Sequence, residues 1–335
     1  MAPVEMGETR APALPLRLRA RAAFISGRFD LVGLCVALVA LCILFTSLTP
    51  FFPTFPNLKA LGVAVSYNAI LAAGQTVVIV GGLIDLSFTA VLALSGIAAQ
   101  KLLLLGVPFP LVLLGALALG GCCGLLNAAI CVAGGVNPLI ATIGTGLALR
   151  GLAFIWLGLG SMPYFNDTAL NFLGNGMIAG LPAPLILCVG VIAAIWIMMR
   201  FTRFGSRVYA MGGNETATRL SGVSVAQLKT RVFVLSGVFG AVGGLLLTSL
   251  NGTAFADAGR GDELVVIAAV ILGGTALSGG RGSVIGTALA VLVLGVMANG
   301  MNLLGIDAFW QLFLSGVILL LAVVIDEQRN RARAR

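Results

Sequence analysis

Long runs of apolar residues are the feature of this sequence that most restricts its fold. The run from residue 31 to residue 48 contains no charged side chain, and hydrophobic residues make up 59 % of the 335-residue chain. Charged residues make up 10 %, against about 25 % in soluble domains. Because about 20 apolar residues in a helix are enough to cross a bilayer, this composition excludes a soluble protein and predicts a membrane protein.

Helices and closed β-barrels are the two structures that satisfy every backbone hydrogen bond inside lipid. A barrel needs strands of about ten residues with alternating polarity, and the runs at 31–48 and 264–272 do not alternate. We therefore predict an all-α polytopic membrane protein with about ten transmembrane helices. The expected spans are residues 31–50, 58–80, 86–105, 109–133, 138–160, 184–200, 232–250, 264–280, 283–303 and 308–325.

The distribution of Lys and Arg predicts the orientation, because cytoplasmic loops of membrane proteins carry an excess of these residues. With both termini in the cytoplasm, sixteen of the twenty Lys and Arg residues lie inside. The chain then divides into a cytoplasmic N-terminal tail (1–30), a transmembrane domain (31–325) and a basic cytoplasmic tail (326–335). Residues 161–183 and 251–263 become external loops.

Glycine is abundant, with 45 residues. Small residues four apart let membrane helices approach closely, and the glycine pairs 120/124, 240/244 and 282/286 have this spacing. Residues 77–96 and 270–295 both place a glycine pair ahead of a Leu-Ser element. This likeness is too short to predict an internal repeat.

Several chemistries are excluded by what the sequence lacks. It contains no His, and its six Cys residues fall within apolar spans without metal-ligand spacing, so we expect no metal site. A nucleotide-binding P-loop places Gly directly before Lys, and none of the three Lys residues follows a Gly. No clustered Ser, Cys or paired carboxylates predict a catalytic centre, so we expect neither an enzyme nor a cofactor in this chain. The net charge of +8 comes from basic residues at span ends and does not indicate nucleic acid.

The longest polar segment inside the apolar chain is residues 200–231, with six basic residues and one acid, Glu215. Asn214 is predicted to cap a short helix that has Glu215 in its first turn. Gly222 is predicted to end that helix in the left-handed conformation, and Ser224 to cap a second short turn. A structured element between two spans indicates a docking site for a cytoplasmic partner.

Two ionisable residues lie in or beside apolar spans, where a charge costs about 3 kcal/mol on the insertion scale. Arg150 either lines a solute path or holds a neighbouring helix by pairing, or it donates to backbone carbonyls in a purely architectural role. Asp85 either shapes a gate at a broken helix or caps the helix that follows it. The segment around Asp85, residues 81–87, is either a tight cytoplasmic turn or a break within the membrane.

Further polar residues in or near the spans either contact a neutral, hydroxyl-rich solute or form hydrogen bonds between helices. They are Gln75, Asn127, Asn137, Thr142, Thr145, Asn299, Asn302 and Gln311. The residues that we expect along a solute pathway are Gln75, Asp85, Asn137, Thr142, Arg150, Asn299 and Asn302.

Four blocks of sequence carry a resemblance to a known family. They are 81–96 (GGLIDLSFTAVLALSG), 138–151 (PLIATIGTGLALRG), 202–223 (TRFGSRVYAMGGNETATRLSGV) and 262–302, which contains LGGTALSGGRGS and ANGMN. Over about residues 60–325 the chain resembles the permease subunits of bacterial ABC importers of the ribose, xylose and galactoside type. Leu83, Phe88 and Thr89 depart from the family's pattern.

The resemblance implies a permease subunit of a sugar importer in the bacterial inner membrane. It implies a pore formed with a second copy or a paralogue, two cytoplasmic ABC ATPase subunits that bind ATP and Mg²⁺, and a periplasmic binding protein that delivers the sugar. The ATPase contact is then expected at Arg203, Gly205, Gly213, Asn214, Glu215, Arg219 and Gly222. The acidic external loop 251–263 either meets the binding protein or is a solvated loop, and neither the sugar nor the second permease is identified.

Two functions of other classes stay open. A secondary transporter or channel working alone needs acidic or His residues along its path, and the spans nearly lack them. A membrane scaffold or receptor leaves Arg150 and the segment 81–87 without a role. Uptake into ATP-depleted vesicles that lack the ATPase favours the first alternative, and any solute flux excludes the second.

Overall fold

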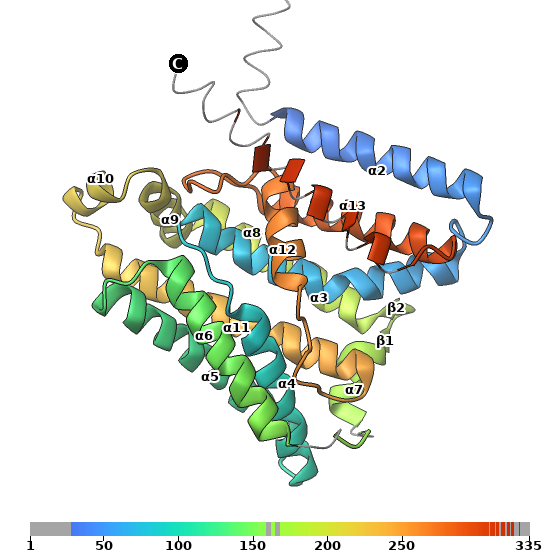
Figure 1. Ribbon diagram of the computed structural model, residues 1–335, viewed down its shortest axis with the longest axis horizontal. Helices are drawn as coiled ribbons and strands as arrows, with labels where there is room; N and C mark the ends of the chain where they lie inside the picture. The colour runs from blue at the N-terminus through green and yellow to red at the C-terminus, as the bar shows by residue number, and fades with distance from the viewer. Residues whose placement is uncertain are drawn as a thin grey trace, which may run out of the picture.

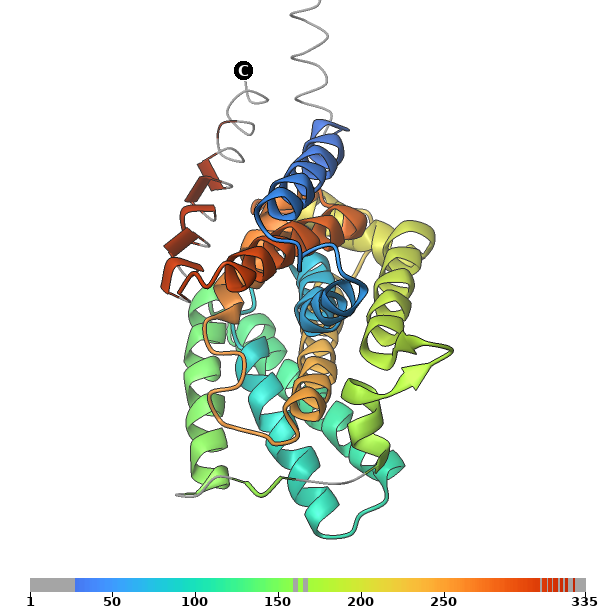
Figure 2. The same cartoon turned by 90° about the vertical axis from the view of Figure 1, so that its right-hand side faces the viewer.

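The computed structural model describes residues 28–158, 162–164 and 168–307, and residues 309–311, 313–314, 316–318, 320–321, 323–324 and 328 near the C-terminus. The two predicted cytoplasmic tails lie almost wholly outside the described residues, and so does part of the expected last span. Figures 1 and 2 show the molecule from two directions at right angles.

The described chain is helical almost throughout (Figure 1). Its long helices are α2 (Arg28–Leu48), α3 (Phe55–Val80), α4 (Phe88–Leu104), α5 (Phe109–Ala128), α6 (Pro138–Leu157), α8 (Ala183–Phe201), α11 (Val225–Asn251) and α13 (Val284–Leu303). The shorter ones are α7 (Thr168–Asn175), α9 (Arg203–Gly213), α10 (Glu215–Leu220) and α12 (Asp262–Leu272), and a π-helical stretch, η1 (Ala129–Ala133), continues α5. Strands β1 (Met177–Ile178) and β2 (Leu181–Pro182) form a short antiparallel hairpin.

Seven helices in the described part of the chain are long and apolar enough to cross a membrane, namely α2, α3, α5 with η1, α6, α8, α11 and α13. This confirms the prediction of an all-α, multi-pass chain. α4 is apolar but only 17 residues long, and α12 has 11 residues. The expected count of about ten spans therefore stays a prediction, as does the cytoplasmic location of both termini.

Helix α11 is the central element, with α3, α4 and α5 packed around it. Glycine allows these helices to meet backbone to backbone. A Cβ atom at Gly237 would lie 2.0 Å from the carbonyl oxygen of Gly120, and one at Gly244 would lie 2.2 Å from that of Leu92. In lipid the hydrophobic effect does not drive helices together, so they associate through close packing of this kind. Helices α2 and α13 lie at the opposite edge of the molecule from α5 and α6 (Figure 1).

Helices α3 and α12 each end in the same type of turn. After α3, Gly82 has a φ of 74° and the N–H of Leu83 donates to the carbonyl of Val78 at 3.1 Å. After α12, Gly274 has a φ of 89° and the N–H of Thr275 donates to the carbonyl five residues before it at 3.2 Å. Both are Schellman helix ends, so the likeness between the two glycine pairs corresponds to a repeated local structure.

The chain beyond each of these ends leaves the helical path. Residues 81–87 run from α3 to α4 with most of their length buried, and Asp85 is 1 % exposed. This is the burial of a break inside the protein and not of an exposed turn. The predicted span 264–280 is wrong in its second half, because α12 ends at Leu272. Gly279 and Gly280 then adopt φ values of 82° and 74°, which a helix does not allow.

The two breaks meet each other and helix α9 at one place, which we call the glycine junction and define as Val80, Gly212 and Gly280. The N–H of Gly280 donates to the carbonyl of Val80 at 2.8 Å. A Cβ atom at Gly212, near the end of α9, would lie 1.9 Å from that carbonyl oxygen and 2.5 Å from the nitrogen of Gly280. Beside the junction, the Tyr209 hydroxyl donates to the carbonyl of Gly282 at 3.0 Å.

We predict that Gly212→Ala destabilises the protein, because the new methyl group has no space between two backbone segments. Overpacking of this kind costs about 1–3 kcal/mol, and it should lower the melting temperature of the detergent-solubilised protein. The matched control is Gly213→Ala, whose Cβ atom would meet nothing closer than the Cα of Gly280 at 4.0 Å. Equal melting temperatures for the two variants would contradict the close approach.

Candidate functional site

Asp85 is completely enclosed in the break between α3 and α4. Its Oδ1 accepts hydrogen bonds from the backbone N–H and the hydroxyl of Ser87, at 2.8 and 2.7 Å. Its Oδ2 accepts one from the hydroxyl of Ser236 at 2.6 Å, which in turn accepts from Nε2 of Gln75 at 2.9 Å. No Lys or Arg of the described chain forms an ion pair with Asp85.

The hydrogen bonds continue from the break to two further helices. The hydroxyl of Ser87 accepts from Nδ2 of Asn127 at 2.7 Å, and Oδ1 of Asn127 accepts from the hydroxyl of Thr145 at 2.6 Å. We call these side chains the Asp85 network, and they come from the break and from α3, α5, α6 and α11. Its members are Gln75, Asp85, Ser87, Asn127, Thr145 and Ser236.

The geometry of this network corrects one interpretation of Asp85. Ser87 occupies the cap position of α4, which begins at Phe88, and the carboxylate bonds Ser87 itself and no N–H of the first turn. Asp85 therefore does not cap the helix in the way the sequence suggests. Instead, its oxygens join the break to α11, and buried polar groups satisfied in this way hold a segment in a single position.

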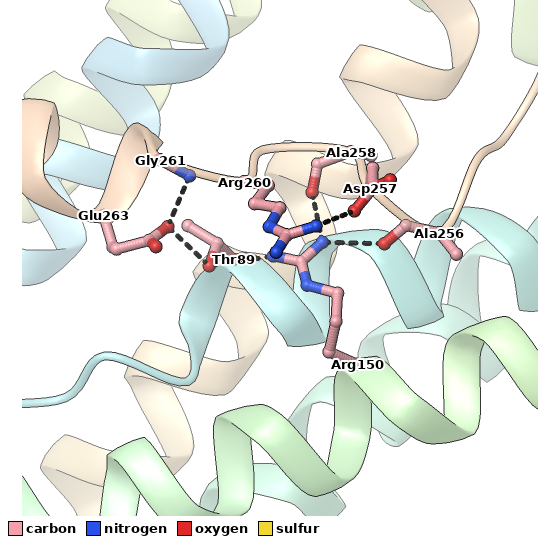
Figure 3. A network of polar contacts seen from close by, with 8 residues as sticks. All are labelled: Thr89, Arg150, Ala256, Asp257, Ala258, Arg260, Gly261 and Glu263. Carbon is pink, nitrogen blue, oxygen red and sulfur yellow. Dashed lines mark hydrogen bonds and ion pairs between the residues drawn. The ribbon is translucent and has the colours of Figure 1, made fainter.

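Arg150 forms a second group of contacts, which Figure 3 shows. Its Nη1 donates to the carbonyls of Ala256 and Ala258, at 2.8 and 2.6 Å, and its Nη2 donates to the hydroxyl of Thr89 at 3.2 Å. The Thr89 hydroxyl donates to Oε2 of Glu263, which also accepts a backbone N–H, each at 3.1 Å. The half-buried guanidinium thus ties the connection between α11 and α12 to α4 and α6. This is the arrangement that the architectural interpretation describes, and passage of solute beside Arg150 stays a prediction.

Asn137 and Thr142 have local partners. The exposed Asn137 caps α6, since its Oδ1 accepts from the N–H of Leu139 at 2.9 Å. The Thr142 hydroxyl donates one helical turn back to the carbonyl of Pro138 at 2.8 Å, and it lies 3.4 Å from the carbonyl of Ile84 in the break. The structure therefore places Thr142 against the break and leaves Asn137 apart from the other expected pathway residues.

Asn299 and Asn302, at the end of α13, belong to a third group. The amides of Asn299 and Asn57 exchange two hydrogen bonds of 3.0 and 2.9 Å, and Oδ1 of Asn302 accepts from Nε2 of Gln311 at 2.6 Å. Both Asn side chains line a cavity of about 370 Å³. Apart from Asn137, the expected pathway residues thus form three separate groups and not one continuous lining.

The polar segment 200–231 folds into two short helices and the start of α11. The Thr202 hydroxyl accepts from the N–H of Gly205 at 3.3 Å to cap α9, and Oδ1 of Asn214 accepts from the N–H of Ala217 at 2.8 Å to cap α10. Gly222 has a φ of 85°, as predicted. The second short turn expected after Ser224 is instead the beginning of the 27-residue α11, and Ser224 makes no side-chain cap.

The residues expected to contact the ATPase differ in their exposure. Exposed residues are Arg203, Gly213, Asn214, Arg219 and Gly222. Gly205 is buried, and a Cβ atom there would lie 2.2 Å from the carbonyl oxygen of Met199, so Gly205 packs α9 against α8 and offers no surface. Leu220, which the sequence reasoning did not single out, ends α10 with its side chain 84 % exposed.

Glu215 is held in place by two cations. It forms ion pairs of 2.9 Å with both Arg219 and Lys229. The first pair lies within α10, and the second joins α10 to α11. The hydrogen bond from Lys229 is the main cause of a Glu215 pKa below its ordinary value of 4.5. The ion pairs therefore contribute to stability above that value and are lost as the pH falls through the lowered pKa.

In the described chain, no group of three or more His, Cys, Asp or Glu side chains is placed to hold a metal ion.

Comparisons with known proteins give a consistent family match. Residues 57–323 match the family described as branched-chain amino acid transport system / permease component. The chain is 38 % identical to ribose import permease protein RbsC of Escherichia coli (strain K12), over 88 % of this chain and 93 % of the relative. It is 36 % identical to ribose import permease protein RbsC of Bacillus subtilis (strain 168), over 91 % and 95 %, and 36 % identical to L-arabinose transport system permease protein AraH of Escherichia coli (strain K12), over 93 % and 95 %. No solved structure matches the chain.

We predict that Asp85→Leu destabilises the protein far more than Asp85→Asn. Leucine leaves the Ser87 and Ser236 donors buried without an acceptor, at a cost of about 1–3 kcal/mol for each group. Asparagine keeps Oδ1 for Ser87 and a polar partner for Ser236. Thermal unfolding in detergent measures the difference, and equal melting temperatures for the two variants would contradict a structural role for the carboxylate.

We also predict that Arg150→Leu loosens the connection between α11 and α12, because two carbonyls lose their donor. Hydrogen–deuterium exchange at residues 252–261 should rise, and transport should fall in step with membrane abundance. The control is Arg260→Leu, since Arg260 is exposed and pairs with Asp257 at 3.1 Å. A loss of transport that far exceeds the loss of abundance would show instead that Arg150 acts on the solute.

Proposed function

The chain belongs to the family of branched-chain amino acid transport system permease components, and from that premise we propose that it is the pathway-forming subunit of an ATP-driven sugar importer. It is a transport permease subunit and not an enzyme. The relatives at 36–38 % identity are import permeases for ribose and L-arabinose. Their names support a monosaccharide or a related small polar molecule as the solute here.

The observation that carries the proposal is the exposed tip formed by α10. Leu220 is 84 % exposed in a segment that is otherwise polar, and the basic side chains of Arg203 and Arg219 are exposed with it. An exposed leucine at the end of a short helix that also exposes Arg219 offers a protein partner an apolar contact beside a basic one. We propose that a separate cytoplasmic ATPase, which binds ATP and Mg²⁺, docks on this tip. Its expected contacts are Arg203, Gly213, Asn214, Glu215, Arg219 and Gly222.

The position of α9 supports a mechanism for coupling. Helix α10 follows α9 directly, and α9 touches both breaks, through Gly212 at the glycine junction and through Tyr209 at Gly282. We propose that ATP binding and hydrolysis on the partner displace α9 and α10 together. Because interfaces packed this closely shift between discrete arrangements, the movement is transmitted to the ends of α3 and α12 and the starts of α4 and α13. Access to the pathway then alternates between the two sides of the membrane.

The proposed setting follows from charge and from the family. Both termini and the α9–α10 pair are proposed to be cytoplasmic. About ten spans then cross the bacterial inner membrane. A second copy of the chain or a paralogue completes the pore. The external connection between α11 and α12, with Asp257, Asp262 and Glu263 against Arg260, is the proposed contact for a periplasmic sugar-binding protein. Arg150 supports that contact by holding the carbonyls of this connection.

We predict that Leu220→Asp abolishes co-elution of the purified chain with its cognate ATPase and reduces ATP-driven uptake to background. An exposed side chain contributes little to folding, so the melting temperature should change little. The matched control is Leu105→Asp, because Leu105 is 79 % exposed at the turn after α4 and lies on the proposed external side. A Gly-Ser replacement of residues 214–219 should act as Leu220→Asp does.

Two outcomes would contradict the proposal. Undiminished ATPase binding and transport in both altered chains would exclude α10 as the docking element. Sustained sugar uptake into ATP-depleted vesicles that lack the ATPase would instead assign the chain to secondary transporters or channels.

A further inference from the structure

A cavity of about 370 Å³ lies among α3, α12 and α13. Small-molecule sites occupy about 300–1,000 Å³, with mostly apolar walls and a few polar groups. The walls here are mainly aliphatic, with Leu61, Val65, Val266, Val291 and Leu294 among them. None of the described residues that line the cavity is Lys or Arg, so it offers no counter-charge to an anion.

The polar side chains of the cavity come from distant parts of the sequence. They are Asn68 on α3, Asp262 at the start of α12, Asn299 and Asn302 on α13, and Gln311 beyond it. We call these five residues the amide cluster. Oδ1 of Asn68 is buried and has no hydrogen-bond partner among the described residues. A buried acceptor of this kind is costly unless water or a ligand satisfies it, and because Asn68 lines the cavity, a turn of its side chain brings the acceptor to an occupant.

Other members of the amide cluster are held in place and keep unused capacity. Asp262 accepts from the Tyr67 hydroxyl through Oδ2 at 3.1 Å, and a carboxylate offers about four acceptor positions. The double hydrogen bond with Asn57 fixes the Asn299 amide, and each Asn side chain has two N–H donors. The cavity therefore presents oriented acceptors and donors above apolar walls.

This combination fits a neutral molecule with several hydroxyl groups. Each hydroxyl both donates and accepts, so adjacent hydroxyls can bridge a carboxylate and an amide, while the C–H faces of such a molecule pack on aliphatic side chains. We propose that the cavity is the entry subsite for a neutral polyhydroxylated solute of monosaccharide size. The inference rests on the proposed function and assigns its solute a binding position in the chain.

The position of the cavity supports an entry role. Its residues lie in the first half of α3, on α12 from Asp262 to Ala269, and on α13 from Val291 to Asn302. The beginning of α3, the beginning of α12 and the end of α13 belong to the external side in the proposed orientation. Asp262 directly follows the connection that Arg150 holds against α4 and α6. The far end of α12 leads into the break that meets α9 at the glycine junction. The cavity thus lies between the proposed delivery surface and the proposed coupling helix.

The test uses the chain reconstituted in vesicles with its ATPase and its binding protein. The probe is whichever of ribose and L-arabinose, the sugars in the names of the relatives, the vesicles take up. Asn68→Leu should raise the KM for uptake about tenfold, the effect of losing one strong hydrogen bond, and leave complex assembly unchanged. Asn251→Leu is the control, because Asn251 is an exposed amide on the same proposed side that lies outside the cavity.

A second measurement reports occupancy without transport. In Ala298→Cys the new thiol lies on the cavity wall, where no native Cys of the described chain lies, and mass spectrometry follows its reaction with a neutral maleimide. The probe sugar should slow this reaction severalfold, and the added change Asn68→Leu should remove the protection. Equal labelling of the thiol with and without sugar would overturn the subsite. Protection of the thiol that disappears when lipid is removed would also overturn it, because lipid and not the sugar would then be covering the cavity wall. Transport that survives Asn68→Leu unchanged would also overturn it, whereas sugar uptake that persists in ATP-depleted vesicles without the ATPase would contradict the proposed function itself.

Discussion

One hydrogen bond between two interrupted helices organises the functional part of this permease. The N–H of Gly280 donates to the carbonyl of Val80 at 2.8 Å, so the break after α12 is fastened to the end of α3. Gly212 of α9 packs on the same two groups with no room for a side chain. A bond of this kind contributes about 1 kcal/mol by itself, but it fixes where α4 and α13 begin. Helix α9 therefore rests directly on the places where the membrane helices are interrupted.

Interrupted helices leave backbone groups without helical partners, and in a membrane protein those groups need partners inside the fold. The break at residues 81–87 meets this need with the Asp85 network, in which a buried carboxylate receives three hydrogen bonds. The connection between α11 and α12 meets it with Arg150, which supplies donors to two carbonyls. Each ionisable side chain that looked like a candidate for solute contact thus holds irregular backbone in position. Buried acceptors without a partner among the described residues include Oε1 of Gln75 in the Asp85 network and Oδ1 of Asn68 in the amide cluster.

Much of the organisation was predictable from the sequence, because it depends on periodicity and local chemistry. Asn214 and Gly222 mark the two ends of α10 by capping rules that need no tertiary contact. The family resemblance of block 202–223 groups Gly205 with the docking residues, but Gly205 is buried against α8. Leu220 was missed because a single leucine in a polar segment gives no signal until its exposure is known. Ser87 and Ser236 were missed for a similar reason, since isolated Ser residues occur throughout apolar spans.

The sequence by itself determined that the chain is a helical, multi-pass membrane protein with a structured polar element between two spans, because composition and local capping suffice for these properties. It also determined the family, through blocks that the comparisons match. Only the tertiary structure decided that α12 stops at Leu272, that the two breaks meet at α9, and that Asn68 and Asp262 share a cavity with the end of α13. These outcomes depend on contacts between residues about 200 positions apart, and neither periodicity nor charge specifies which faces of apolar helices meet.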